Sequence, residues 1–156
     1  MRSIIVLGTL LVGLQGAVAG PLTVGQCLDI YTGLSALDHY DRVAKDDKGE
    51  HIISSQYKLG ATRLTIAMNL AALKPVVEAT DKARLGLVAE MGGEAIKANS
   101  PQYKQLSAEY EKVRAANCSA QLETIDTEQL KLGDGPDENP IPPGTLSLLV
   151  PILSKK

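Results

Sequence analysis

The chain has 156 residues, a formal charge of −2 from 16 Lys and Arg against 18 Asp and Glu, no Trp and no Phe. One domain of this length can bury roughly two-thirds of the surface that its unfolded chain exposes. The near balance of charge argues against nucleic-acid binding through a basic face, and the shortage of aromatic side chains argues against binding single strands by base stacking. We therefore expect no nucleic-acid partner.

The first residues have the composition of a secretory leader. Arg2 is their only charge, an apolar run over Ile4–Leu14 follows, and a small Ala-Val-Ala motif ends at Ala19. A positive start, a short apolar stretch and an A-x-A motif are the three parts of a cleavable signal peptide. We therefore predict a signal peptide over 1–19, with cleavage between Ala19 and Gly20.

Two alternatives to export remain open. The apolar stretch is shorter than the roughly 20 residues that span a bilayer as a helix, so a retained membrane anchor is less favoured than cleavage. A start site placed too early would instead leave the protein in the cytoplasm. With cleavage, we expect a periplasmic or secreted protein that is not stably inserted in a membrane.

Cys27 and Cys118 are the only cysteines, so one intramolecular pairing exists. In an oxidising compartment we expect a disulfide, and closing so long a loop stabilises a fold by roughly 4–5 kcal/mol in the chain-entropy model. The alternative is two buried thiols that act as small apolar side chains. A catalytic thiol is disfavoured, because Lys112 and Arg114 are the only cations near either cysteine.

The first predicted helix covers residues 23–38. Thr23 and Gln26 have capping-box spacing, and an apolar face that includes Cys27 follows at helical period. The next residues, 38–51, are polar and contain a Lys-Gly pair, so we expect a loop or a frayed helix end there.

A long helical pattern runs from Ile52 to Met91, with apolar stripes on two sides that predict cover on both. Pro75 interrupts it, and a proline removes a backbone hydrogen bond and clashes with the carbonyl four residues back. The chain therefore either kinks there or ends one helix and starts another. The pair Gly92-Gly93, directly after Met91, predicts the end of this helical pattern. The stripes are Tyr57, Ala61, Leu64, Met68 and Ala71, and Ile66, Leu70, Leu73 and Val77.

A third helix is predicted from Ser100, as N-cap, with Pro101 in the first helical position, to about Asn117. We expect it to pack against the long helix as an antiparallel hairpin. The predicted fold is thus mainly α, a small helical bundle over residues 20–120 built on the long helix.

The last part, 121–156, is predicted to be an extended or loop-rich region. A strand over Gln121–Leu132 is one interpretation of its mixed acidic and aliphatic residues, and turn-forming residues follow. A Pro-Pro-Gly sequence then introduces a short apolar helix or turn, which we expect to dock on the bundle or on a partner because it is too apolar to leave in water. Its predicted interaction surface is Leu146, Leu148, Leu149, Val150, Ile152 and Leu153.

A set of short motifs spreads over residues 22–153. They are Leu22-Thr23-Val24-Gly25-Gln26, Tyr57-Lys58-Leu59, Asn69–Glu78, Asp81-Lys82-Ala83-Arg84, Ile125-Asp126, Leu130-Lys131-Leu132 and Ile141–Leu153. In these motifs and their order, the chain resembles a family of small proteins of unknown function encoded in tailed phages and prophages. The motifs consist of apolar stripes and prolines, and the family offers no catalytic residues to carry over. Its pattern begins close to Leu22, so the leader lies outside the resemblance.

Two polar clusters are candidates for metal binding. His39 and His51 stand among several carboxylates, but they lack the spacing of paired zinc ligands, so a solvated loop is favoured. Residues 134–139 hint at a calcium loop, but a proline and a missing closing acid favour a plain turn. Neither a G-x-S-x-G elbow nor a phosphate-binding P-loop is present. We expect no metal, no cofactor and no enzymatic activity.

These observations favour a non-enzymatic helical binding or assembly protein, phage- or prophage-associated by resemblance and exported if the leader is cleaved. We expect the long helix and the apolar C-terminal segment to contact a protein partner, which could be a second copy. One rival is an envelope-anchored lysis or coat accessory protein that keeps its leader as a signal anchor. The other, least favoured, is a divalent-metal hydrolase that uses His39 and His51.

Overall fold

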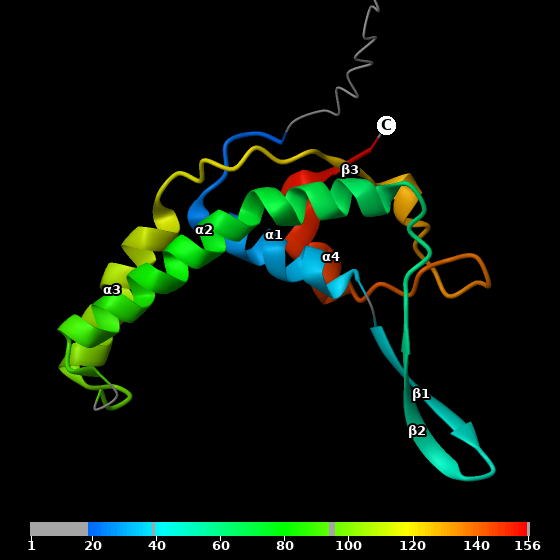
Figure 1. Cartoon of the computed structure of the whole chain (residues 1–156), viewed down its shortest axis with the longest axis horizontal. Coiled ribbons are helices and arrows are strands. Elements are labelled where there is room, and N and C mark those ends of the chain that lie inside the picture. Colours follow the sequence, from blue (N-terminus) through cyan, green and yellow to red (C-terminus); the bar gives the residue numbers. More distant parts are fainter. Residues whose placement is uncertain (1–18, 39, 94–95, 156) are drawn as a thin grey trace, which may run out of the picture.

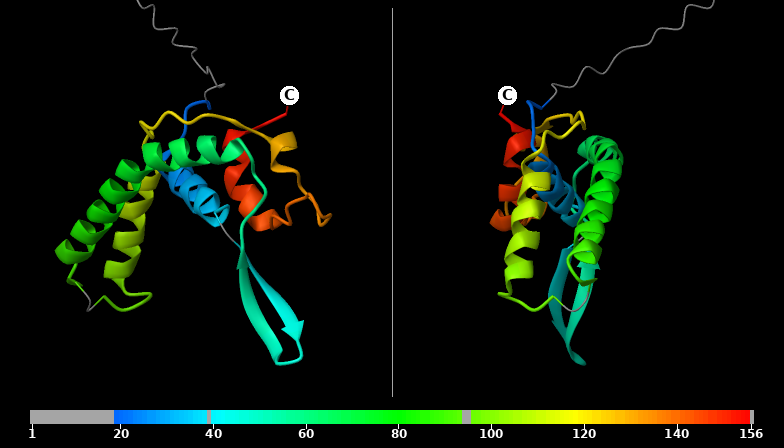
Figure 2. Two further views of the ribbon diagram at one scale, coloured as in Figure 1. Left: turned by 45° about the vertical axis from the view of Figure 1, so that its right-hand side comes forward. Right: turned by 90° about the vertical axis from the view of Figure 1, so that its left-hand side faces the viewer.

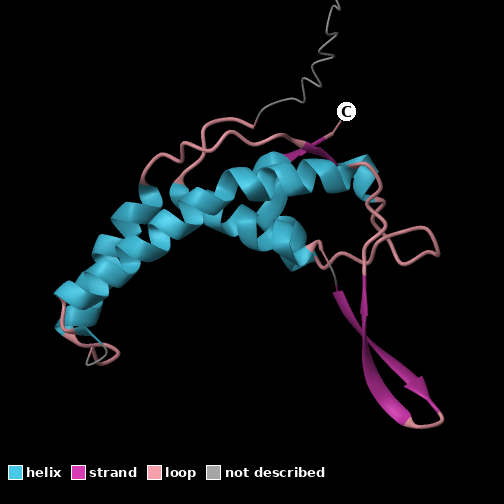
Figure 3. Ribbon diagram, in the orientation of Figure 1, coloured by secondary structure: helices cyan, strands magenta, loops and turns pink. Residues whose placement is uncertain are grey.

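The computed structural model of the chain describes residues 19–38, 40–93 and 96–155. Its fold is mainly α, as the sequence predicts (Figure 3). The helices are α1 (Val24–Ala36), α2 (Thr62–Glu90), α3 (Pro101–Ala115) and α4 (Pro143–Leu149), with short 3-10 helices η2 (Thr127–Leu130) and η3 (Val150–Ile152). The strands are β1 (Tyr40–Asp46), β2 (Gly49–Ser55), β3 (Ile125–Asp126) and β4 (Leu153–Ser154).

The long helix α2 organises the molecule (Figure 1). Its first part packs on α1, which in turn packs on α4, and its last part pairs with α3 to form an arm. The β1–β2 hairpin projects from the body on its own, away from that arm (Figure 2). The predicted antiparallel hairpin of α2 and α3 is therefore present, and in the described part of the chain no further strand pairs with the β-hairpin.

Helices α1 and α3 begin where the sequence predicts. Gln26 donates its backbone N–H to the Thr23 hydroxyl at 3.2 Å, and the Gln26 side chain accepts the Thr23 N–H at 2.9 Å. These two bonds are the predicted capping box. At α3, the Ser100 hydroxyl accepts the backbone N–H of Tyr103 at 3.1 Å, and Pro101 occupies the first turn. Local hydrogen bonds therefore set both starts.

The long helix starts later than predicted, at Thr62 rather than Ile52, because Ile52 belongs to β2. Pro75 lies inside one continuous helix, so it does not divide the pattern into two. The helix bends near its middle (Figure 2), as expected where a proline removes a hydrogen bond. It stops before Gly92 and Gly93, which have φ angles of 115° and 66° that favour glycine.

The prediction that both stripes of the long helix are covered is wrong. Ile66 and Leu73 are buried, whereas Leu64 and Met68 on the other stripe are 61% and 49% exposed. Tyr57, assigned to the exposed stripe, lies ahead of the helix and is buried. The body therefore covers one side of α2 and leaves the other side open.

The prediction of a loop over 38–51 is also wrong, since β1 and β2 form an antiparallel pair. Asp46 pairs with Gly49 across a two-residue connection, and the Asp46 carboxylate accepts the Lys48 N–H at 2.7 Å. The strands escape prediction because apolar and polar residues do not alternate along them: on β2 the exposed Ile52 stands directly beside the half-buried Ile53.

One hydrophobic core joins α1 and the first half of α2 to the C-terminal region, and α3 contributes no residue to it. The apolar C-terminal segment therefore docks on the chain's own body, one of the two predicted alternatives. As a correction, Leu149 and Ile152 are fully buried and cannot form part of an exposed interaction surface, whereas Val150 is 64% exposed. Leu146, Leu148 and Leu153 are half-buried. The fully buried aliphatic side chains of the described chain are Ile30, Leu34, Leu37, Leu73, Leu122, Ile125, Leu130, Leu149 and Ile152.

Close packing at α1 and a short strand pair fix the C-terminal segment. A Cβ added at Gly33 of α1 would lie 2.9 Å from the Leu149 side chain, so α4 approaches closely only because this position is glycine. In the predicted extended region, Ile125 pairs in parallel with Leu153. The strand there is limited to β3 and is followed by η2, so the extended prediction holds for only part of the region.

Candidate interaction site

Cys27 and Cys118 form the predicted disulfide, with their Cα atoms 6.7 Å apart. Backbone bonds flank it: Cys118 donates to the Leu22 carbonyl and Val24 donates to the Ala116 carbonyl, both at 2.8 Å. The segment ahead of α1 is thus tied to the segment after α3. A disulfide of this kind is typical of proteins in oxidising compartments.

The predicted signal-cleavage position lies where the described chain begins. Ala19 is half-buried and donates its backbone N–H to the Leu122 carbonyl at 2.8 Å, while Gly20 is exposed. The rest of the predicted signal peptide, 1–18, lies outside the described residues. Among the described residues, cleavage after Ala19 would remove the bond from Ala19 to Leu122 and leave Leu22, which is buried, in place.

Two buried asparagines that sequence reasoning missed hold the body together. Asn69 on α2 donates to the Glu123 carbonyl and accepts the Glu123 N–H, both at 2.9 Å. Asn139 accepts the Lys58 N–H at 2.5 Å and donates to the Leu130 carbonyl at 2.7 Å. Each side-chain amide bonds to backbone groups far away in the sequence, so no local sequence pattern predicts these hydrogen bonds.

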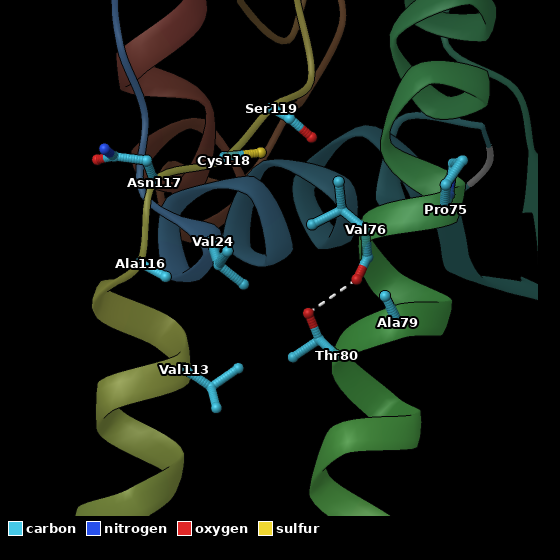
Figure 4. A pocket seen from close by; sticks show the side chains of 10 residues that line it. All are labelled: Val24, Pro75, Val76, Ala79, Thr80, Val113, Ala116, Asn117, Cys118 and Ser119. Atoms are coloured by element: carbon cyan, nitrogen blue, oxygen red, sulfur yellow. Dashed lines mark hydrogen bonds between the residues drawn. The ribbon is translucent and has the colours of Figure 1, made fainter.

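An open groove of about 330 Å³ lies beside the disulfide, between α1, α2 and α3 (Figure 4). Its hydroxyl at Thr80 donates to the Val76 carbonyl at 2.7 Å, one turn back in the same helix. None of the lining side chains is an acid or a base, so the groove offers no proton donor or acceptor for acid–base catalysis. The lining residues are Val24, Pro75, Val76, Ala79, Thr80, Val113, Ala116, Asn117, Cys118 and Ser119.

The predicted metal candidates are not gathered in the described chain. His39 lies outside the described residues, and the His51 side chain is exposed, 3.9 Å from the Asp46 carboxylate. Across the described residues, no group of three or more His, Cys, Asp and Glu side chains could hold a metal ion. In the calcium-like loop, Glu138 accepts the Gly135 N–H at 2.9 Å, which is the geometry of a turn.

The β-hairpin carries the most exposed large aliphatic side chains that the structure describes. Val43 and Ile52 lie directly opposite each other on one face and are 70% and 71% exposed. Polar pairs flank them on the same face: the Lys45 ammonium lies 3.8 Å from the Glu50 carboxylate, and Ser54 donates to Asp41 at 2.6 Å. The face is an apolar centre between two polar rows.

An isolated two-stranded hairpin is at best marginally stable in water, and an exposed strand edge is a template for pairing with another chain. The hairpin face of Asp41, Val43, Lys45, Glu50, Ile52 and Ser54 is therefore the candidate interaction site. The stripe of Leu64 and Met68 on α2 is a second, smaller exposed apolar surface. The sequence signal that could have located the hairpin is the Asp47-Lys48 turn, followed by Gly49, between the Val43 and Ile52 segments.

In the comparisons with known proteins, no family model, no curated protein and no solved structure matches this chain. Within the described residues, none of the helices combines the length and the apolar character needed to cross a bilayer.

Proposed function

We propose that the protein is a non-enzymatic binding or assembly protein of phage or prophage origin, which works in the periplasm or outside the cell. Its contact element is the projecting β1–β2 hairpin. The observation that carries the proposal is the exposed apolar pair Val43 and Ile52, at the centre of a projecting hairpin whose two strands contact chiefly each other in the described chain.

The rest of the molecule, from which the hairpin projects, supports the proposal that the hairpin is the contact element. The core, the disulfide and the two buried asparagines hold a rigid platform from which the hairpin extends. Binding surfaces carried on loops or projections of a rigid scaffold are common in proteins. An exposed Val and Ile at the centre of a patch, with charged residues around them, is the arrangement of a small protein-binding surface.

Export is supported by two independent features. The leader has the three parts of a signal peptide in order, and the Cys27–Cys118 bond is stable in an oxidising compartment. The phage association rests on the resemblance of the motifs over residues 22–153.

Site-specific photo-crosslinking in the native host tests the contact element. A photoreactive residue at Val43 or Ile52 should give a crosslinked product of discrete mass. The matched control is Leu85 on the α2–α3 arm, which is 53% exposed but lies outside the hairpin. Equal crosslinking at Leu85, or none at the hairpin positions, would refute the proposed contact.

Cell fractionation and intact-mass measurement test export in the same strain. The expected species lies outside the cytoplasm, begins at or near Gly20 and contains no free thiol. A cytoplasmic species that retains Met1 would refute the export part and leave the hairpin proposal to the crosslinking result.

A further inference from the structure

We propose that the partner of the hairpin is a second copy of this chain, which pairs edge to edge with β1 around a two-fold axis through Val43. The inference rests on the proposed role of the hairpin as the contact element. In this arrangement β1 runs antiparallel to its counterpart, Val43 faces Val43 of the other copy, and two hairpins merge into a four-stranded sheet.

The backbone of β1 has the pattern that such pairing requires. Asp46 and Gly49 close a two-residue connection, and the closing pair of such a hairpin is hydrogen-bonded. Hydrogen-bonded and non-bonded pairs then alternate, so the N–H and C=O groups of Asp41, Val43 and Lys45 point away from β2. In the described chain no strand other than β2 pairs with β1, so these groups form a free edge.

The charges of Asp41 and Lys45 favour Val43 as the position of the two-fold axis. A two-fold axis at Val43 places Asp41 of each copy opposite Lys45 of the other, because these residues lie two positions before and two positions after Val43. Both carry exposed, opposite charges, and opposite charges directly across antiparallel strands stabilise the pair. The same symmetry makes each contact occur twice, as in any two-fold interface.

The rest of the hairpin face extends this match. Ile52 lies beside Val43 within each copy, so the two copies would align four aliphatic side chains in one row across the sheet. On either side, Glu50 and Lys45 of one copy continue into Asp41 and Ser54 of the other, so that charges of opposite sign alternate along the row. Along these rows, no two like charges lie directly opposite each other.

The other edge of the hairpin offers no such match. The same symmetric pairing of β2 around Ile52 would place Glu50 opposite Ser54, which gives no ion pair. The charge pattern therefore favours β1 as the edge that joins two copies.

Charge-reversal variants of the oxidised full chain test the pairing by sedimentation velocity. Wild-type protein should dimerise reversibly. Asp41→Lys places two lysines opposite each other and Lys45→Asp two aspartates, so each variant alone should weaken the dimer by about tenfold or more. Mixing the two variants restores both opposite-charge contacts between the copies and should restore the dimer.

Lys48→Asp is the matched control, because it reverses a charge in the turn of the same hairpin but outside the proposed rows, and it should leave the dimer unchanged. A wild-type chain that stays monomeric at high concentration would overturn the inference, as would a mixture of the two single variants that fails to dimerise. Crosslinking of Val43 to a different protein would then still support the proposed function, whereas absence of any crosslink at the hairpin would remove both.

Discussion

The body and the hairpin of this molecule are stabilised in opposite ways. In the body, Leu149 and Ile152 are fully buried, Asn139 pairs with distant backbone, and Cys27 is bonded to Cys118. In the hairpin, the two strands contact chiefly each other and leave Val43 and Ile52 exposed to solvent. The same residue types therefore have different tasks in the two regions.

This difference separates the residues that stabilise the fold, which lie in the body, from those that are free to contact a partner, which lie in the hairpin. A side chain of the body that is removed leaves a cavity or an unpaired polar group, and both are costly. Removal of an exposed side chain of the hairpin creates neither a cavity nor an unpaired group, and only reduces the surface that a partner can contact. Substitutions should accordingly separate into those that change the free energy of unfolding and those that change association.

Truncation after Asn139 should have the largest effect. It removes Ile141, Leu149 and Ile152 from the core, and each such buried side chain contributes roughly 1.5–3 kcal/mol, against a typical total stability of about 5–15 kcal/mol. We expect the truncated protein to lose its cooperative thermal transition in circular dichroism. A truncation after Ser154 is the control and should melt like the full chain. A cooperative transition near the original temperature in the shorter protein would contradict the docking of this segment.

Replacement of both cysteines by alanine, Cys27→Ala with Cys118→Ala, should be the next largest change. Loss of the cross-link frees the unfolded chain, so the free energy of unfolding should fall by about 2–5 kcal/mol while the helix content stays the same. Urea titration followed by far-ultraviolet circular dichroism measures both quantities. An unchanged urea midpoint would show that the bond adds nothing to the stability of the body.

The Asn139→Ala variant should cost about 1–3 kcal/mol, because it leaves the Lys58 N–H and the Leu130 carbonyl without their partner. The matched control is Asn117→Ala, since Asn117 is exposed and should tolerate the change. Equal urea midpoints for the two variants would argue that the buried amide does not hold the body together.

The smallest effect is expected for Ile52→Ala, within about 0.5 kcal/mol of wild type, because Ile52 is 71% exposed. The same change at the fully buried Ile152 should cost about 2–5 kcal/mol. The two variants delete the same atoms, so the difference between their melting curves measures the contrast between hairpin and body directly. If Ile52→Ala cost as much as Ile152→Ala, the hairpin would belong to the cooperative core.

Much of the helical architecture could be predicted from sequence because its signals are local. Thr23 with Gln26 and Ser100 with Pro101 lie within one turn of the helix starts they fix. The single disulfide was also predictable, since Cys27 has one possible partner.

The rest of the fold depends on distant contacts or on the absence of contacts. Asn69 and Asn139 bond to backbone far along the chain, so their roles have no local signature. The strands around Val43 and Ile52 carry no alternating pattern, because one face is exposed at these residues and the other face, at Ile53, is only half-buried. The candidate site was therefore missed because its residues are exposed. Exposed residues do not produce the burial pattern by which a strand is found in a sequence.

The disulfide has a mechanical consequence. Cys27 and Cys118 are 91 positions apart, and β1, β2, α2 and α3 all lie between them. Tension applied to the two ends of the chain would pass through the covalent bond and bypass these elements. An unbroken bond withholds roughly 300 Å of contour length, at about 3.3–3.6 Å per residue. The hairpin and the arm would thus stay folded under a load that peels away the C-terminal segment.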